Sequence, residues 1–110
     1  MDTNQVIAAL SSLAQETRLN VFKLLMEFGN DGVAAGVLSD ELDIPHNTLS
    51  FHLSHLNRAG LVTSKRDGRS IIYKANCDVI ESVISFLTKN CCARSTETCI
   101  PAKPVRSNKS

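Results

Sequence analysis

The sequence predicts a small, mainly α-helical domain with one β-hairpin. Apolar residues recur at helical spacing at about residues 3–15, 16–28 and 79–90, and in two short stretches within Gly36–Gly60. Two predicted strands, Leu61–Arg66 and Arg69–Ala75, flank Asp67–Gly68, a strong hairpin signal because a type I′ turn needs positive φ at both positions. The 110 residues suffice for one domain with a small core, and oligomerisation often completes such a domain.

The first two predicted helices are amphipathic. Their apolar faces comprise Val6, Ile7, Leu10, Leu13 and Ala14 in the first helix and Leu19, Phe22, Leu25 and Met26 in the second. Gly29–Gly32 ends the second helix, because glycine and asparagine tolerate the turn conformations that a helix end requires.

The stretch Gly36–Gly60 predicts two short helices joined by a tight turn. The apolar stripes of this pair are Leu38 and Leu42 in its first helix and Leu49, Leu53 and Leu56 in its second. Ile44–Pro45 separates the two helices, because the residue before proline is disfavoured in the helical region. Gly60 suits the C′ position after the second helix, where a left-handed residue is favoured.

The second helix of this pair has an outward face that could contact DNA. The candidate residues on this helix are His46, Asn47, Thr48, Ser50, Phe51, His52 and Ser54. None of them is a carboxylate, and short polar groups with one aromatic suit a groove of DNA better than open water. An ordinary helical hairpin is the alternative that this stretch alone leaves open.

The hairpin that follows favours the DNA interpretation. Lys65, Arg66 and Arg69 cluster at its tip, and a basic-tipped hairpin directly after a helix-turn-helix is typical of the wing in a winged helix. Residues 46–74 hold five basic and one acidic side chains, whereas residues 1–45 hold two basic and seven acidic ones. This local basic block is the electrostatic footprint of a nucleic-acid reader. A solvated, charged turn is the alternative.

The last predicted helix indicates a homodimer. Asp78 and Glu81 have the spacing of a capping box at its start. Its apolar residues, which are too many for one small core, are Val79, Ile80, Val83, Ile84, Phe86 and Leu87. Because the first helix is also apolar along one side, we expect the two terminal helices to form a twofold interface, so that a dimer reads a twofold operator.

The character of the chain changes at Cys91. We expect residues 1–90 to form the domain and residues 91–110 to form a flexible tail, because polar residues dominate Ala93–Ser110. The chain has no apolar run that would span a bilayer and no signal-peptide pattern, so we expect a cytoplasmic protein with reduced thiols.

Three of the four cysteines, Cys91, Cys92 and Cys99, lie in this polar tail, with no histidine near them. Adjacent cysteines diverge in a rigid helix but can converge at a helix end. Three thiolates without a fourth donor suit a soft ion of trigonal preference, such as arsenic(III) or antimony(III), better than tetrahedral zinc. A redox pair or incidental thiols remain alternatives, and the role of Cys77 stays open.

Residues 5–88 resemble the ArsR/SmtB family of winged-helix repressors that sense metals and metalloids. The stretches that carry the resemblance are Leu13–Leu19, Thr48–Leu53, Arg58–Val62, and Arg66–Arg69 leading to Tyr73. The resemblance implies a homodimer, joined through its first and last helices, that binds operator DNA and releases it when the ion binds.

The chain departs from two known sensor sites of this family. Ala34 and Gly36 occupy the positions of the two cysteines found in many arsenic sensors. Asp78 and Glu81 lack the histidine partners that zinc sensors carry on the last helix. The resemblance therefore implies a site at the C-terminal cysteines, as in members whose arsenic site lies at the end of the last helix. Pro45 also replaces the usual capping serine, and we expect Asn47 to supply the cap.

The sequence thus predicts an arsenic(III)- or antimony(III)-responsive transcriptional repressor without an organic cofactor. Another metal sensor, or a winged-helix repressor that senses thiol oxidation, is the main alternative. We do not expect an enzyme, because no phosphate-cradling loop surrounds a cysteine and no histidine or arginine accompanies one in a catalytic pattern.

Overall fold

The computed structural model describes residues 1–96 of the chain. Its elements are α1 (Thr3–Leu13), α2 (Glu16–Phe28), the 3-10 turn η1 (Gly29–Asp31), β1 (Val33–Ala34), α3 (Ala35–Leu42), α4 (His46–Arg58), β2 (Val62–Asp67), β3 (Ser70–Ala75) and α5 (Cys77–Thr88). The predicted winged helix-turn-helix, with five helices and a hairpin, is confirmed. The expectations for Cys99 and the rest of residues 97–110 lie outside the described residues.

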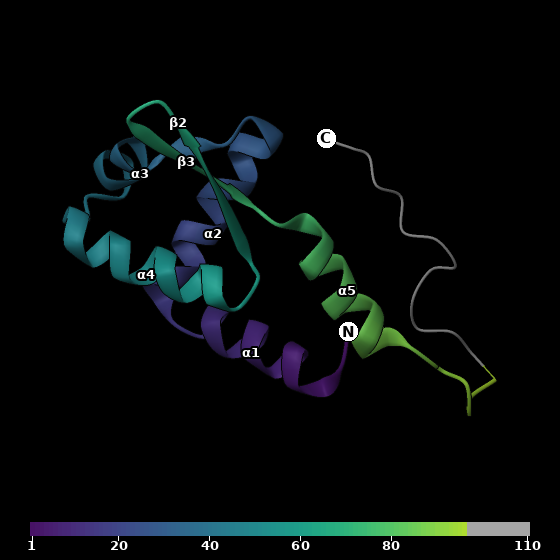
Figure 1. Cartoon of the computed structure of the whole chain (residues 1–110). Coiled ribbons are helices and arrows are strands. Elements are labelled where there is room, and N and C mark those ends of the chain that lie inside the picture. The colour runs from purple at the N-terminus through teal and green to yellow at the C-terminus, as the bar shows by residue number, and fades with distance from the viewer. Residues whose placement is uncertain (97–110) are drawn as a thin grey trace.

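The helices gather around a small antiparallel sheet (Figure 1). The sheet has the order β1-β3-β2, with Val33 opposite Tyr73 and Val62 opposite Ala75. In Figure 1 the β2–β3 hairpin lies above α4, and α5 runs beside α1 at the end of the molecule that holds the N-terminus. No helix within residues 1–96 has the length and apolarity to cross a lipid bilayer.

The core is built from apolar residues of every helix and of all three strands. Its most deeply buried large side chains are Val21, Leu25, Leu38, Leu49, Leu53, Leu56, Leu61 and Val62. The predicted stripe of α4 is therefore confirmed. In α2 the buried set is Val21, Phe22 and Leu25, whereas Leu19 and Met26 are 43% and 41% exposed. The apolar face that the sequence predicts is therefore wider than the side of this helix that faces the core.

A hydrogen-bonded turn separates α3 from α4. Asp43 ends α3 in the left-handed conformation, with φ of 55°. The Ile44 N–H donates to the Ser39 carbonyl, and the Ser39 hydroxyl donates back to the Ile44 carbonyl. Pro45 is the N-cap of α4 and offers no side-chain bond. Asn47 lies inside the first turn, where its Oδ1 accepts from the Thr48 N–H at 2.9 Å, so it satisfies one free donor without occupying the cap position.

Gly60 ends α4 as the sequence predicts, with φ of 81°. The Gly60 N–H donates to the Asn57 carbonyl and the Leu61 N–H donates to the Leu56 carbonyl, which together form a Schellman motif. The Asn57 side chain also donates to the Val62 carbonyl at 3.2 Å. The end of α4 is therefore bonded directly to β2, the first strand of the hairpin.

Two predicted details of the following elements are wrong. The two-residue hairpin loop is Gly68–Arg69, because Asp67 still pairs with Ser70. Only Gly68 has positive φ there, which is the pattern of a type II′ turn and not of type I′. The N-cap of α5 is Asn76 and not Asp78, and its side chain donates to the Gly60 carbonyl at 3.1 Å. The bond between Asn76 and Gly60, and not a local capping box, thus fixes the start of α5.

Gly32 provides a test of how β1 joins the sheet. Its φ is 72°, and a Cβ atom there would lie 2.7 Å from Ile72 Cγ2 and 2.9 Å from the Tyr73 carbonyl oxygen. We expect Gly32→Ala to lower the free energy of unfolding by roughly 2–4 kcal/mol, through backbone strain and steric overlap.

The matched control for this prediction is Gly36→Ala. Gly36 lies in α3, and a Cβ atom added to it would meet nothing within 4 Å. This change should be neutral or stabilise the domain by about 0.5–1 kcal/mol, because alanine favours helix. Urea unfolding of both variants measures the difference, and equal stabilities would contradict the assigned packing of Gly32.

Candidate nucleic-acid interface

The outward side of α4 presents a continuous polar face. Among the residues that the sequence nominates for DNA contact, those with exposed side chains are His46, Asn47, Thr48, Ser50, Phe51 and Ser54. Phe51 is 59% exposed, which is unusual for an aromatic side chain on a small domain. The helix carries no acidic residue, so no carboxylate on it would repel the phosphates or the acceptor atoms of the bases in DNA.

His52 does not share this face. Its side chain is only 8% exposed, and its Nδ1 atom lies 3.3 Å from Arg18 Nη1 of α2. Burial, assisted by the nearby charges of Arg18 and His55, lowers the pKa of His52 below its ordinary value. The sequence-based nomination of His52 for DNA contact is therefore not supported by its position, because its ring points into the domain.

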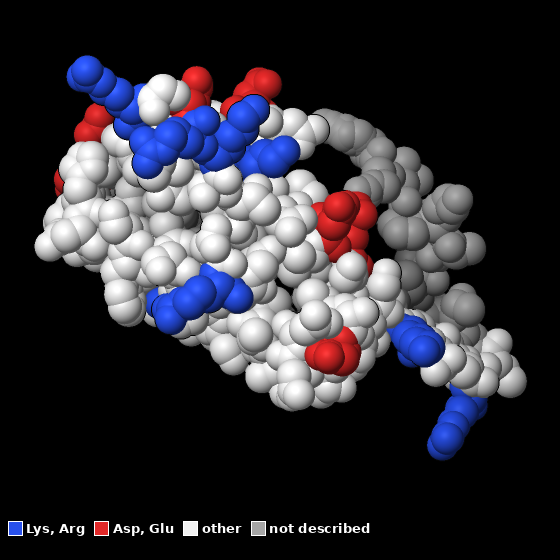
Figure 2. Space-filling view, viewed as in Figure 1, with Lys and Arg blue, Asp and Glu red and all other residues white. Residues whose placement is uncertain are grey.

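Lys65, Arg66 and Arg69 are all exposed at the hairpin tip. In Figure 2 the Lys and Arg side chains gather along the upper edge of the molecule, over the hairpin, and no acidic side chain appears over α4. Lys65 pairs with Ile72 and Arg66 pairs with Ile71. Because adjacent strand residues point to opposite faces, the wing presents cations on both of its sides.

Arg18 lies within the Leu13–Leu19 stretch that carries the family resemblance, but the sequence analysis assigned it no role. Its Nε atom donates to the Ser12 carbonyl at 2.8 Å while its Nη1 reaches His52, and the Ser12 hydroxyl lies 3.0 Å from His55 Nδ1. These four residues join α1, α2 and the inner side of α4. No spacing along the chain signals this network, since Arg18 and His52 are 34 positions apart.

The described thiols form two separate groups. Cys91 and Cys92 follow α5, and their Sγ atoms lie 3.5 Å apart, which confirms that adjacent cysteines converge beyond the helix end. Cys77 is the first residue of α5 and is exposed, with its Sγ 3.7 Å from Met26 Sδ. A helix of 12 residues, about 18 Å long, separates Cys77 from the other pair.

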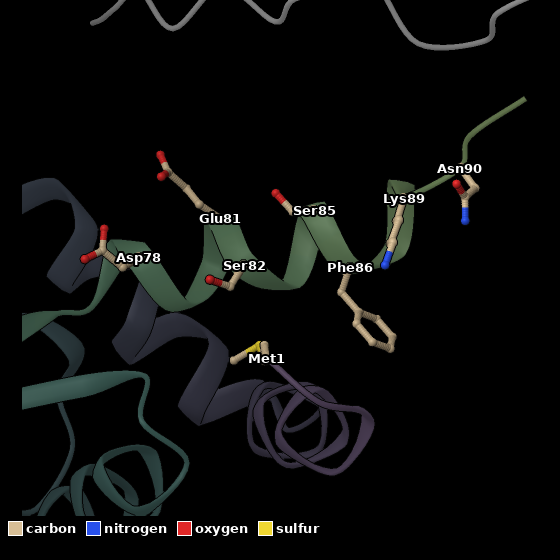
Figure 3. A pocket seen from close by; sticks show the side chains of 8 residues that line it. All are labelled: Met1, Asp78, Glu81, Ser82, Ser85, Phe86, Lys89 and Asn90. Atoms are coloured by element: carbon tan, nitrogen blue, oxygen red, sulfur yellow. The ribbon is translucent and has the colours of Figure 1, made fainter. Parts of the chain in front are cut away.

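Neither of the family's other two sensor sites has a complete set of donor side chains. Ala34 and Gly36 lie in β1 and at the start of α3, and neither has a metal-binding side chain. Asp78 and Glu81 line an open hollow between α5 and Met1, together with Phe86 but without histidine (Figure 3). Within residues 1–96, no cluster of three His, Cys, Asp or Glu side chains has the geometry to hold a metal ion.

Comparisons with known proteins identify the type of domain. Residues 13–65 match the model of a family described as a helix-turn-helix domain. An uncharacterized HTH-type transcriptional regulator of Methanocaldococcus jannaschii is 35% identical over 71 residues, which cover 64% of this chain and 78% of that protein. The chain belongs to the helix-turn-helix transcriptional regulators.

Other relatives of this regulator differ in their named roles. The transcriptional activator HlyU of Vibrio cholerae is 26% identical over 88 residues, covering 80% of this chain and 79% of that protein. A provisionally named arsenical resistance operon repressor ArsR of Halobacterium salinarum is 36% identical over 63 residues, covering 57% of this chain and 48% of that protein.

Solved structures show that the regulator has an ArsR-like winged-helix fold. An ArsR-like transcriptional regulator of Rhodococcus superposes with a TM-score of 0.70 at 26% identity, covering 78% of both chains. The homodimeric winged helix-turn-helix domain Mb0332 of Mycobacterium bovis superposes with a TM-score of 0.65 at 23% identity, covering 86% of this regulator and 87% of that chain.

The exposed face of α4 and the wing should contribute differently to DNA binding. We expect Arg69→Ala to weaken binding to all DNA sequences about equally, because a phosphate contact releases counterions whatever the sequence. The slope of the logarithm of the binding constant against the logarithm of salt concentration should fall in magnitude by roughly one. Ser50→Ala or Asn47→Ala should instead relax the preference among base pairs.

Fluorescence anisotropy measures both effects, with operator DNA selected from a random library and a salt series for each variant. Lys89→Ala is the control, because it removes an exposed cation just after α5, away from α4 and the wing. An Arg69→Ala protein that binds like wild type at every salt concentration would refute the wing contact.

Proposed function

We propose that this regulator is a repressor that binds operator DNA as a homodimer and releases it when arsenic(III) or antimony(III) binds the thiolates of Cys91, Cys92 and Cys99. The observation that carries the proposal is the 3.5 Å separation of the Cys91 and Cys92 sulfur atoms at the end of α5. The protein would act in the cytoplasm, where operator DNA lies and where thiols stay reduced.

Recognition of DNA is the first part of the proposal. The uncharged polar groups on α4 suit base edges in the major groove, and the cations of the wing suit phosphates. Because Lys65 and Arg66 project from opposite faces of the hairpin, a wing lying along a groove would hold cations toward both of its phosphate walls.

Dimerisation is the second part, and exposed apolar residues of α1 and α5 support it. Ile7 and Leu10 of α1 are 55% and 44% exposed, and Ile84 and Leu87 of α5 are 55% and 62% exposed. The two helices pack against each other, so these side chains can form one continuous surface that a second copy covers. Val83 is only 5% exposed and packs in the domain's own core, so its predicted place in the dimer surface was wrong.

We expect Leu87→Lys to convert the dimer to a monomer, because dimerisation would bury an ammonium group without a partner at a cost of several kcal/mol. Operator affinity should fall with it, since each monomer holds only one recognition helix. Ile71→Lys is the matched control, because it places the same charge on a 40% exposed residue of the wing. Sedimentation velocity compares the two, and a dimeric Leu87→Lys protein would exclude this interface.

The thiol site is the third part. Thiolate is the ligating form of cysteine, and two converging sulfur atoms provide two of the three ligands that trivalent arsenic accepts. Cys99 follows seven residues after Cys92 and can supply the third ligand. The name of the Halobacterium relative, a repressor of an arsenical resistance operon, agrees with this choice of inducer.

An oxidation sensor is the second candidate, since the same sulfur atoms could form a disulfide. Chain geometry argues against a bond between Cys91 and Cys92 themselves. The Cα atoms of neighbouring residues lie about 3.8 Å apart, below the usual range of about 4.4–6.8 Å in disulfides. A soft ion bridges two such thiolates without requiring a sulfur–sulfur bond, so the geometry favours the metalloid.

Release of DNA follows from linkage in this proposal. The site lies directly after α5, whose exposed side would form the dimer surface. An ion that binds more tightly to a dimer with badly spaced α4 helices weakens DNA binding, and DNA weakens ion binding by the same factor. A coupling of about 3 kcal/mol corresponds to a loss of operator affinity of more than a hundredfold.

We expect Cys91→Ser and Cys92→Ser to bind operator DNA normally but to respond weakly or not at all to arsenite, because serine is similar in size but a poor soft ligand. Cys99→Ser should retain a partial response, with solvent as the third ligand. Cys77→Ser is the control and should respond like wild type. Anisotropy of DNA release against arsenite, and separately against peroxide, distinguishes the candidates. Wild-type release by both Cys91→Ser and Cys92→Ser would refute the thiol site, and release by peroxide alone would favour the oxidation sensor.

A further inference from the structure

A polar cluster lies between the recognition helix and the body of the domain. It comprises Ser12 at the end of α1, Arg18 in α2, and His52 and His55 on α4. Otherwise the buried side of α4 is made of leucines. Apolar contacts have little directional preference, whereas hydrogen bonds require a defined angle and distance. The cluster therefore fixes the rotation and register of α4 more strictly than the leucines do.

The bond between Arg18 and His52 requires a neutral histidine ring. A guanidinium has only donors, so the His52 Nδ1 atom at 3.3 Å must be the acceptor and the ring proton must sit on Nε2. The bond between Ser12 and His55 has no such requirement. A hydroxyl both donates and accepts, so that contact persists whichever charge His55 carries.

Charge and burial oppose protonation of His52. Its ring is 8% exposed, and the groups that act on its pKa besides burial are Arg18 from α2 and His55 from α4, all of which lower it. The adjoining helix α1 contributes only Ser12, since Thr3–Leu13 contains no titratable side chain. An imidazolium here would lose its acceptor atom and face a guanidinium that cannot lose its proton.

We propose that Arg18 and His52 are positioning residues for DNA recognition, and that acidification releases DNA by protonating His52 and displacing α4 from α1 and α2. This inference rests on the proposed DNA contact of α4. Phe51 connects the two sides of the helix, because its exposed ring contacts the rings of His52 and His55 at centroid distances of 5.4 and 6.5 Å. A shift at His52 therefore reaches the DNA-facing surface directly.

The sign of the effect follows from the lowered pKa. The arrangement that holds His52 neutral is fully stable above the ordinary pKa of 6.5, and its stability falls as the pH drops through the lowered value. His46 also lies on the proposed DNA-contact face, at the start of α4. Its replacement by asparagine leaves His52 and His55 as the only histidines in the variants that are compared.

The experiment measures operator affinity by anisotropy between about pH 5.5 and 7.5 in the full chain carrying His46→Asn. The parent should bind at least about threefold more weakly at the acidic end. Adding His52→Gln should remove this loss, because glutamine keeps an acceptor for Arg18 but cannot gain a proton. Adding His55→Gln, the matched control on the same helix, should preserve the loss.

One further variant and two further measurements test the role of His52. Arg18→Gln should also flatten the profile, because its amide oxygen can accept from an imidazolium. NMR titration of the DNA-free protein should place the His52 pKa below its ordinary value of 6.5, and urea unfolding should show a larger acid-dependent loss of stability where His52 is present than in His52→Gln. Identical pH profiles with and without His52 would overturn the inference. Failure of the wild-type protein to bind DNA at any pH would overturn the proposed DNA contact instead, and the NMR and unfolding data would still test the His52 bond.

Discussion

The packing of α4 on the core is the interaction on which the rest of the structure depends. Leu49, Leu53 and Leu56 are almost fully buried under this helix, so its opposite side must face outward. The polar groups on that side face outward because burial of the leucines selects which side of the helix faces the core. The residues that stabilise the domain and the polar residues that we propose contact DNA thus lie on two faces of one helix of 13 residues.

The helices and the hairpin could be predicted because each follows from local periodicity and turn chemistry. The burial of Leu49 and the ending of α4 at Gly60 are examples in which a pattern within a few residues decides the result. β1 could not be predicted, because its two residues form a strand only by pairing with β3, far along the chain. The cap of α5 was missed for a similar reason, since Asn76 is oriented by its bond to Gly60.

The residues of the candidate site likewise include some whose position follows from local pattern and some whose position depends on distant contacts. Helical periodicity was sufficient to place Asn47, Ser50 and Phe51 on an exposed face. The same periodicity puts position 52 on the side of Leu49 and Leu56, but it could not reveal what makes a buried histidine tolerable there, because its partner Arg18 lies on another helix. The proximity of the Cys91 and Cys92 sulfur atoms was predictable because the residues are adjacent, whereas the choice between an ion and an oxidant depends on chemistry outside the fold.

The junction around Gly60 has a mechanical consequence. The carbonyl groups of Gly60 and Leu61 accept hydrogen bonds from Asn76, and the Asn57 side chain donates one to the Val62 carbonyl. These bonds connect α4, β2 and α5 at one junction. These hydrogen bonds leave no flexible segment between α4, which we propose contacts DNA, and the start of α5. With α5 as a lever arm of about 18 Å, a displacement of about 1 Å at its far end tilts it by roughly 3°. Ion binding at the C-terminal thiols would then change the position of the proposed DNA-contact surface through a rigid tilt of α5, with no unfolding of secondary structure.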